Sequence, residues 1–129
     1  MSERLALELD KLTAAIAVLR ESMDDDESRK ARDSMLLRFV FTFEMAWRCM
    51  KFAMAARGLS TPDYAAAVLR AALQAQIIVD AALWDTLREY RNEVSNAYEE
   101  ATAIEIAAYV RQHALPAFEQ ILSDLRSGD

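Results

Sequence analysis

The densest polar segment of the chain is Arg91-Asn92-Glu93-Val94-Ser95-Asn96-Ala97-Tyr98. The guanidinium of Arg91 is always charged and suits phosphate or carboxylate groups. Arg91 and Asn96 lie about 140° apart around a regular helix. They therefore converge only if the backbone is irregular here, or if two copies of the segment meet across a dimer. The segment predicts either a helix end, where polar side chains satisfy free backbone groups, or a binding site built from Arg91, Asn96 and Tyr98.

A second charged group consists of Glu44, Arg48 and Lys51, which fall within about 60° of one another on a helix. Glu44 precedes Arg48 by four residues, the favourable order for a helical ion pair. Apolar residues flank this strip on both sides, so it must be partly buried or line a groove. The pattern is explained either by an ion pair alone or by a functional site built from these residues.

The sequence lacks the residue patterns that several other kinds of chemistry require. The sequence has no Gly-rich phosphate loop and no cluster of Cys and His. His113 is the only histidine, and Cys49 is the only cysteine and has no nucleophile signature. We therefore expect no metal site, no cofactor and no internal disulfide.

The elements that position these residues are predicted to be helices. The chain has 2 Gly and 2 Pro among 129 residues, too few for the turns of a β-sandwich or barrel. The fold class expected is all-α, an up-and-down four-helix-type bundle of about five helices in one domain, 1–129. Helices are expected over 2–22, 28–57, 62–76, from 81 to a break between 91 and 101, and 102–126, with Pro116 kinking the last.

The helix expected over 28–57 has two apolar sides. One contains Leu36, Val40, Phe43, Trp47, Met50 and Met54, and the other contains Leu37, Phe41, Met45 and Phe52. Two apolar sides predict a central position in the bundle or a subunit interface.

Charge is distributed unevenly along the chain. The net charge is −6, yet residues 28–58 contain seven basic and two acidic residues. The overall balance argues against general nucleic-acid binding. The basic segment forms either salt bridges with acidic neighbours or a local site for an anion. Charged residues interrupt the longest apolar stretch, and the first ten residues do not form a signal peptide, so we expect a cytoplasmic protein with no membrane segment.

The segment from Arg38 to Arg48, followed by Lys51, resembles the Arg-Phe-x-x-Thr-x-Glu-x-x-Trp-Lys segment of the nucleotidyltransferase substrate-binding family, within the HEPN superfamily. Further matches follow in the same order and extend the resemblance over roughly residues 5–125. They are Gly58, Pro62, Asp80, Trp84, and Arg91, Asn92, Ser95 and Tyr98 of the polar segment.

The resemblance implies a HEPN-like helical bundle that forms a homodimer. It also implies association with a small nucleotidyltransferase encoded nearby, often as a toxin–antitoxin pair. Ribonuclease members carry Arg, four residues, His, one residue, Tyr, and in some pairs the partner transfers AMP to this Tyr. By position Arg91 and Tyr98 match this motif, so the resemblance makes Tyr98 a candidate for AMP modification.

Asn96 occupies the position of the motif histidine. An amide cannot accept and return a proton near neutral pH, so it does not replace histidine as a general acid or base. We therefore expect a non-catalytic substrate-binding or partner subunit rather than an enzyme. Its expected binding residues are Arg38, Glu44, Arg48, Lys51, Arg91, Asn92 and Tyr98, and the basic face is a candidate site for nucleotide or RNA. The alternatives are a metal-independent HEPN-type ribonuclease with a degenerate motif, and a generic helical interaction module.

Overall fold

The computed structural model describes residues 2–23, 28–96 and 99–128, and this part of the chain is helical without strands. The elements are α1 (Glu3–Ser22), α2 (Arg29–Ala56), α3 (Ala65–Gln74), α4 (Ala81–Val94), α5 (Glu100–Tyr109), the π-helical turn η1 (Val110–Ala114) and α6 (Leu115–Arg126). The predicted all-α bundle is confirmed. The acidic segment expected to connect the first two helices, 24–27, lies outside the described residues.

The long helices α1 and α2 begin as their sequences predict. The hydroxyls of Ser2 and Ser28 accept hydrogen bonds from the backbone N–H groups of Leu5 and Ala31, each at 3.1 Å. Such bonds satisfy N–H groups that have no partner within the helix. The apolar side chains of α1, spaced three and four residues apart, are buried; they are Leu5, Leu9, Leu12, Ile16 and Leu19.

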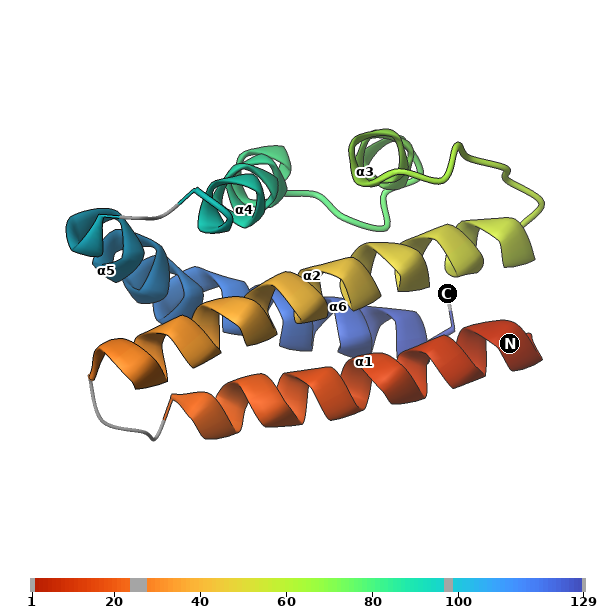
Figure 1. The fold of residues 1–129 in the computed structure, drawn as a ribbon. Helices are drawn as coiled ribbons and strands as arrows, with labels where there is room; N and C mark the ends of the chain where they lie inside the picture. Colours follow the sequence, from red (N-terminus) through yellow and green to blue (C-terminus); the bar gives the residue numbers. More distant parts are fainter. Residues whose placement is uncertain (1, 24–27, 97–98, 129) are drawn as a thin grey trace.

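Helix α2 occupies the centre of the bundle. It packs against α1, α3, α4, α5 and α6, and Figure 1 shows α1 on one side of it and α3 and α4 on the other. Its buried side places Phe39 and Phe43 in a cluster with Trp84 of α4 and Phe118 of α6, with neighbouring ring centroids 6.1–6.5 Å apart. The predicted central position is therefore confirmed, and this aromatic cluster ties three helices together.

The second apolar side of α2 is only partly covered. Leu37 is 70% exposed and Phe41 is 57% exposed, while Met45 and Phe52 are half-buried. In Figure 1 this helix crosses the front of the molecule with no element over it. The structure thus leaves an apolar strip of α2, Leu37 and Phe41, in contact with solvent.

Two predicted helix starts are wrong. Helix α3 begins at Ala65 rather than at Pro62, because Asp63 is engaged by Lys51 at 2.9 Å instead of complementing the helix dipole. Helix α5 begins at Glu100, so Thr102 lies within the helix and not at its cap. The expected break is confirmed, since α4 ends at Val94, and the helix is capped at its start by Asp80, whose side chain accepts from the Leu83 N–H at 3.0 Å.

Pro116 disturbs the last helix as expected, in the form of a widened turn. The N–H of Leu115 bonds to the carbonyl of Val110, five residues back. Proline lacks an N–H and its ring crowds the carbonyl four residues before it, so the turn ahead of Pro116 expands into a π-helical one. No helix among the described residues combines the length and the apolar character needed to span a lipid bilayer.

Candidate functional site

The polar centre of the molecule is an ion pair between Glu44 in the middle of α2 and Arg91 in the last turn of α4. The Nε and Nη2 atoms of Arg91 lie 2.7 and 2.6 Å from the Oε1 atom of Glu44. The indole N–H of Trp47 donates to the other carboxylate oxygen, Oε2, at 2.9 Å. Both oxygens of Glu44 therefore have donors, and the network joins two helices from distant parts of the sequence.

Partial burial strengthens this network. The side chains of Arg91 and Glu44 are 38% and 27% exposed, and Trp47 is buried at 7%. Charge-assisted bonds shielded from water contribute more than those of an exposed ion pair. Trp47 was not expected as a partner, although the sequence contains the signal for it: a buried indole N–H needs an acceptor, and Glu44 lies three residues earlier on the same helix.

The predicted ion pair between Glu44 and Arg48 is wrong. Arg48 is half-buried, and it forms neither a hydrogen bond nor an ion pair with another residue that the structure describes. Arg91 places two nitrogens, Nε and Nη2, within 2.7 Å of Glu44, and this close charge-assisted contact takes the place of the helical pair. Arg48 therefore keeps its charge available on the strip next to Glu44.

A cleft of about 490 Å³ opens beside Arg91, between α2 and α4. Its lining includes the apolar side chains of Leu37 and Val40 of α2 and Val94 of α4, the positive side chain of Arg91 and the negative side chain of Asp33. The remaining terminal nitrogen of Arg91, Nη1, donates to the Asn92 side-chain oxygen at 3.1 Å. The guanidinium is thus held by Glu44 and Asn92 while Arg91 lines the cleft, where it can meet an anionic group.

The structure separates Asn96 from this arrangement. Its backbone N–H bonds to the Glu93 carbonyl at 2.8 Å, where α4 has already ended. The Asn96 side chain is exposed, and the Arg91 donors go to Glu44 and Asn92 instead. Tyr98 lies outside the described residues. Of the predicted polar segment, the structure brings Arg91 and Asn92 together with Glu44.

Lys51 lies further along the same strip of α2 and pairs with Asp63 in the connection to α3. The Nζ–Oδ1 distance is 2.9 Å. The hydrogen bond and the charge of Lys51 hold the pKa of Asp63 below its ordinary value of 3.8, and the charge of Arg48 adds to this effect. Lys51 and Arg48 thus make a positive field at the C-terminal half of α2.

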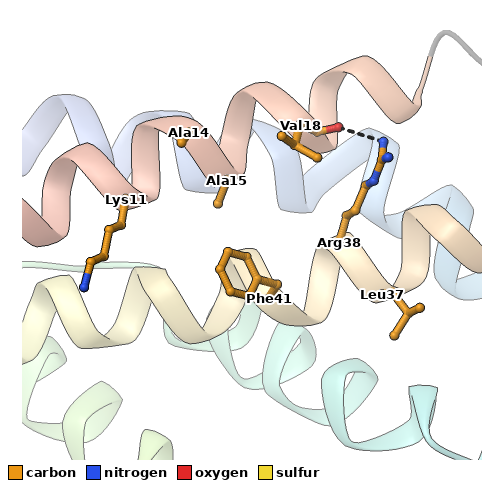
Figure 2. Close-up of a pocket in the computed structure, with 7 residues that line it drawn as sticks. All are labelled: Lys11, Ala14, Ala15, Val18, Leu37, Arg38 and Phe41. Atoms are coloured by element: carbon orange, nitrogen blue, oxygen red, sulfur yellow. Dashed lines mark hydrogen bonds between the residues drawn. The ribbon is translucent and has the colours of Figure 1, made fainter.

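Arg38, by contrast, lies on the other side of α2, facing α1. Its Nη1 atom donates to the Val18 carbonyl at 3.3 Å (Figure 2). Together with Lys11 and the aromatic ring of Phe41, it lines an apolar groove of about 390 Å³ between α1 and α2. Arg38 is therefore not part of the Glu44–Arg91 network.

Cys49 and His113 lie in different settings, one buried and one exposed. Burial, followed by the nearby Glu8 carboxylate, raises the pKa of the Cys49 thiol to about 12, so its nucleophilic thiolate is scarce at neutral pH. The ring of His113 lies 4.6 Å from that of Tyr109, on the surface. The described part of the chain contains no group of three or more His, Cys, Asp or Glu side chains able to hold a metal ion.

One family model covers most of this chain. Residues 7–127 match the model of a family described as "Nucleotidyltransferase substrate binding protein like". No curated protein sequence matches this chain closely enough to count as a relative.

Solved structures share the fold. A Haemophilus influenzae protein, HI0074, described as revealing the fold of a nucleotidyltransferase substrate-binding domain, has a TM-score of 0.78 at 24% identity, covering 92% of this chain and 98% of that one. A tri-AMPylated Shewanella oneidensis HEPN toxin, in complex with MNT antitoxin, has a TM-score of 0.77 at 19% identity, and the match covers 98% of this chain and 99% of the toxin. A Thermus thermophilus protein has a TM-score of 0.73 at 24% identity, and the match covers 90% of this chain and 96% of that protein. Likenesses at this level of identity establish the fold.

Proposed function

Because the chain belongs to the nucleotidyltransferase substrate-binding family, we propose that it is a non-catalytic binding subunit of a small, separately encoded nucleotidyltransferase. The observation that carries this proposal is the Glu44–Arg91 pair, held by Trp47 beside a cleft of about 490 Å³. Such a cleft, with one oriented guanidinium, suits recognition of an anionic substrate group or an acidic partner side chain. The antitoxin complex of the Shewanella oneidensis toxin supports a place in a toxin–antitoxin-like pair.

Co-purification tests the partner directly. The chain and the nucleotidyltransferase encoded beside it are co-expressed with a tag on one of them, and the complex is measured by size-exclusion chromatography with light scattering. We expect a stable complex at micromolar concentration, weakened when Arg91→Gln removes the charge at the cleft. Absence of a complex at that concentration contradicts the proposal.

The basic strip of α2 is the second element of this function. Arg48 and Lys51 lie near one another on the helix, and Arg48 forms no ion pair in the described part of the chain, although its charge acts on Asp63 beside Lys51. A nucleotide or RNA phosphate presented by the partner is the ligand whose charge this strip matches. The confined size of the strip, within a protein of net charge −6, favours one local ligand over indiscriminate binding.

A homodimer is the assembly that the exposed strip of α2 supports. Leu37 lines both hollows that flank this helix, the cleft beside Arg91 and the groove facing α1. Leu37 and Phe41, 70% and 57% exposed, form a ridge between these hollows. A self-complementary pairing would insert each ridge into a hollow of the other copy and remove the apolar surface from water.

Ribonuclease activity has less support. The Arg91 guanidinium is bound to Glu44 and Asn92, and Asn96 cannot act as a general acid or base. Tyr98 remains the candidate AMP acceptor because it matches the tyrosine of the family motif: its hydroxyl oxygen would attack the α-phosphorus of ATP and release pyrophosphate.

A further inference from the structure

A separate pocket of about 330 Å³ lies between α3 and α4. These two helices pack against each other and lie on the side of α2 opposite α1 (Figure 1). The floor is apolar and the rim is charged. The floor contains Leu69, Ile78 and Trp84, and the rim contains Arg70, Asp85 and Arg88.

The floor is part of the protein core. Leu69 and Ile78 are each 5% exposed and Trp84 is 4% exposed. Trp84 also contacts the aromatic cluster, with its ring centroid 6.4 Å from that of Phe43. A floor made of buried side chains is already formed, so a ligand would not have to order it on binding.

The two rim arginines come from different helices: Arg70, which is exposed, from α3 and Arg88, which is half-buried, from α4. Arg70 follows Leu69 directly on α3, and Arg88 lies one turn after Trp84 on α4. The chain between the helices returns through Gln76, whose φ of 61° allows the reversal that places Ile78 in the floor. Two residues from different helices thus bring their guanidinium groups to one pocket.

The charges of this pocket are unsatisfied within the described part of the chain. Arg70, Asp85 and Arg88 form no ion pair there, although the chain carries an excess of acidic residues. The interhelical ion pairs among the described residues use different arginines; they are Arg20–Glu119, Arg32–Glu100, Arg91–Glu44 and Arg126–Asp10. Two positive groups and one negative group leave the rim with a net positive charge, which attracts an anion.

We propose that this pocket binds a small organic anion. A phosphate or carboxylate group lies between Arg70 and Arg88, where planar guanidinium groups bind such oxygens. The apolar part of the ligand rests on Leu69, Ile78 and Trp84. The volume is at the lower end of small-molecule sites, which are about 300–1,000 Å³, so it fits a compact ligand. This site lies apart from the Glu44–Arg91 cleft and requires no partner protein.

Titration of the purified full chain with phenyl phosphate and with benzoate tests the proposal. Binding is followed by calorimetry and by the indole N–H signals in the NMR spectrum. The chain has 2 Trp, so Trp47→Phe assigns the signal of Trp84. We expect the Trp84 signal to shift with one or both probes, and the tighter probe identifies the anionic group. Inorganic phosphate, which lacks an apolar part, is expected to bind more weakly.

The variants Arg70→Gln and Arg88→Gln are each expected to lower the affinity about tenfold, since each removes one charge-assisted contact. The matched control is Arg29→Gln, which removes the same charge from an exposed position at the start of α2. Circular dichroism verifies that all three variants fold.

Three results overturn the proposal. The first is that neither organic probe binds at millimolar concentration. The second is that inorganic phosphate binds as tightly as phenyl phosphate. The third is that Arg29→Gln weakens binding as much as the pocket variants do. The last result identifies general charge attraction, and none of the three depends on the nucleotidyltransferase partner.

Discussion

The Nε atom of Arg91 donates a hydrogen bond at 2.7 Å to one carboxylate oxygen of Glu44, 47 residues earlier in the chain, and its Nη2 atom lies 2.6 Å from the same oxygen. Trp47 occupies the other oxygen. The pair therefore has a structural role, joining α4 to α2, and it also fixes the direction of the one guanidinium that borders the cleft.

Replacing Glu44 with Gln should destabilise the protein by about 1–2 kcal/mol, because Arg91 loses a charged acceptor while part of the pair remains in water. Urea denaturation gives the free energy of unfolding. A double-mutant cycle with Arg91→Gln should show coupling of about 1 kcal/mol. Glu21→Gln, on an exposed part of α1, is the control and should change little. Purely additive effects would contradict a direct interaction.

The buried thiol of Cys49 should make the protein less stable in alkali. Its pKa is raised from 9.0 to about 12, so above pH 9 the unfolded chain loses the thiol proton while the folded chain keeps it. The free energy of unfolding should then fall by up to about 1.4 kcal/mol per pH unit until pH approaches 12. Cys49→Ala should remove this part of the slope in urea denaturation, and an unchanged slope would count against burial of the thiol.

The carboxyl of Asp63 should titrate below 3.8, because Lys51 donates a hydrogen bond to it. The pair stabilises the folded state at pH values above 3.8, and this contribution is lost as pH falls through the lower folded pKa. NMR titration of the Asp63 side chain measures the value directly. Lys51→Gln should raise the pKa toward 3.8, whereas Lys30→Gln, at an exposed position near the start of α2, should leave it where it is.

Placing a charge on the exposed strip of α2 should weaken self-association. Phe41→Glu puts a carboxylate on the ridge proposed to lie in the dimer interface, and the cost of burying it should lower the dimer affinity at least tenfold. Sedimentation velocity measures the change. Ile104→Glu is the matched control, because Ile104 is 49% exposed but lies on α5. Equal weakening by both variants, or a wild-type chain that stays monomeric at high concentration, argues against this interface.

Incubation with the nucleotidyltransferase partner and ATP should attach AMP to Tyr98. Intact-mass spectrometry detects the adduct, and Tyr98→Phe should abolish it because no phenolic oxygen remains to attack ATP. Tyr64→Phe, at a tyrosine 56% exposed, is the control and should be modified as the wild type is. An adduct that persists on the Tyr98 variant places the modification at another residue.

Local patterns in the sequence were sufficient for much of the fold. The buried stripe of α1, the cap at Asp80 and the break after Val94 all depend on residues within one or two helical turns of each other. The two-sided apolar pattern of α2 likewise predicted its central position. Spacing and capping chemistry act over such short distances, and both can be read from the order of residues.

Partner choice was decided by tertiary structure. Glu44 has Arg48 one turn away on its own helix, yet it binds Arg91, which packing of α4 on α2 brings within 2.7 Å. Similarly, Lys51 forms an ion pair with Asp63, which was expected to lie in the first turn of α3 but precedes that helix. Only the packing of α3 on α4 places Arg70 and Arg88 around one pocket. A charged side chain selects the partner with the best geometry and the least water, and both conditions depend on the arrangement of helices in space.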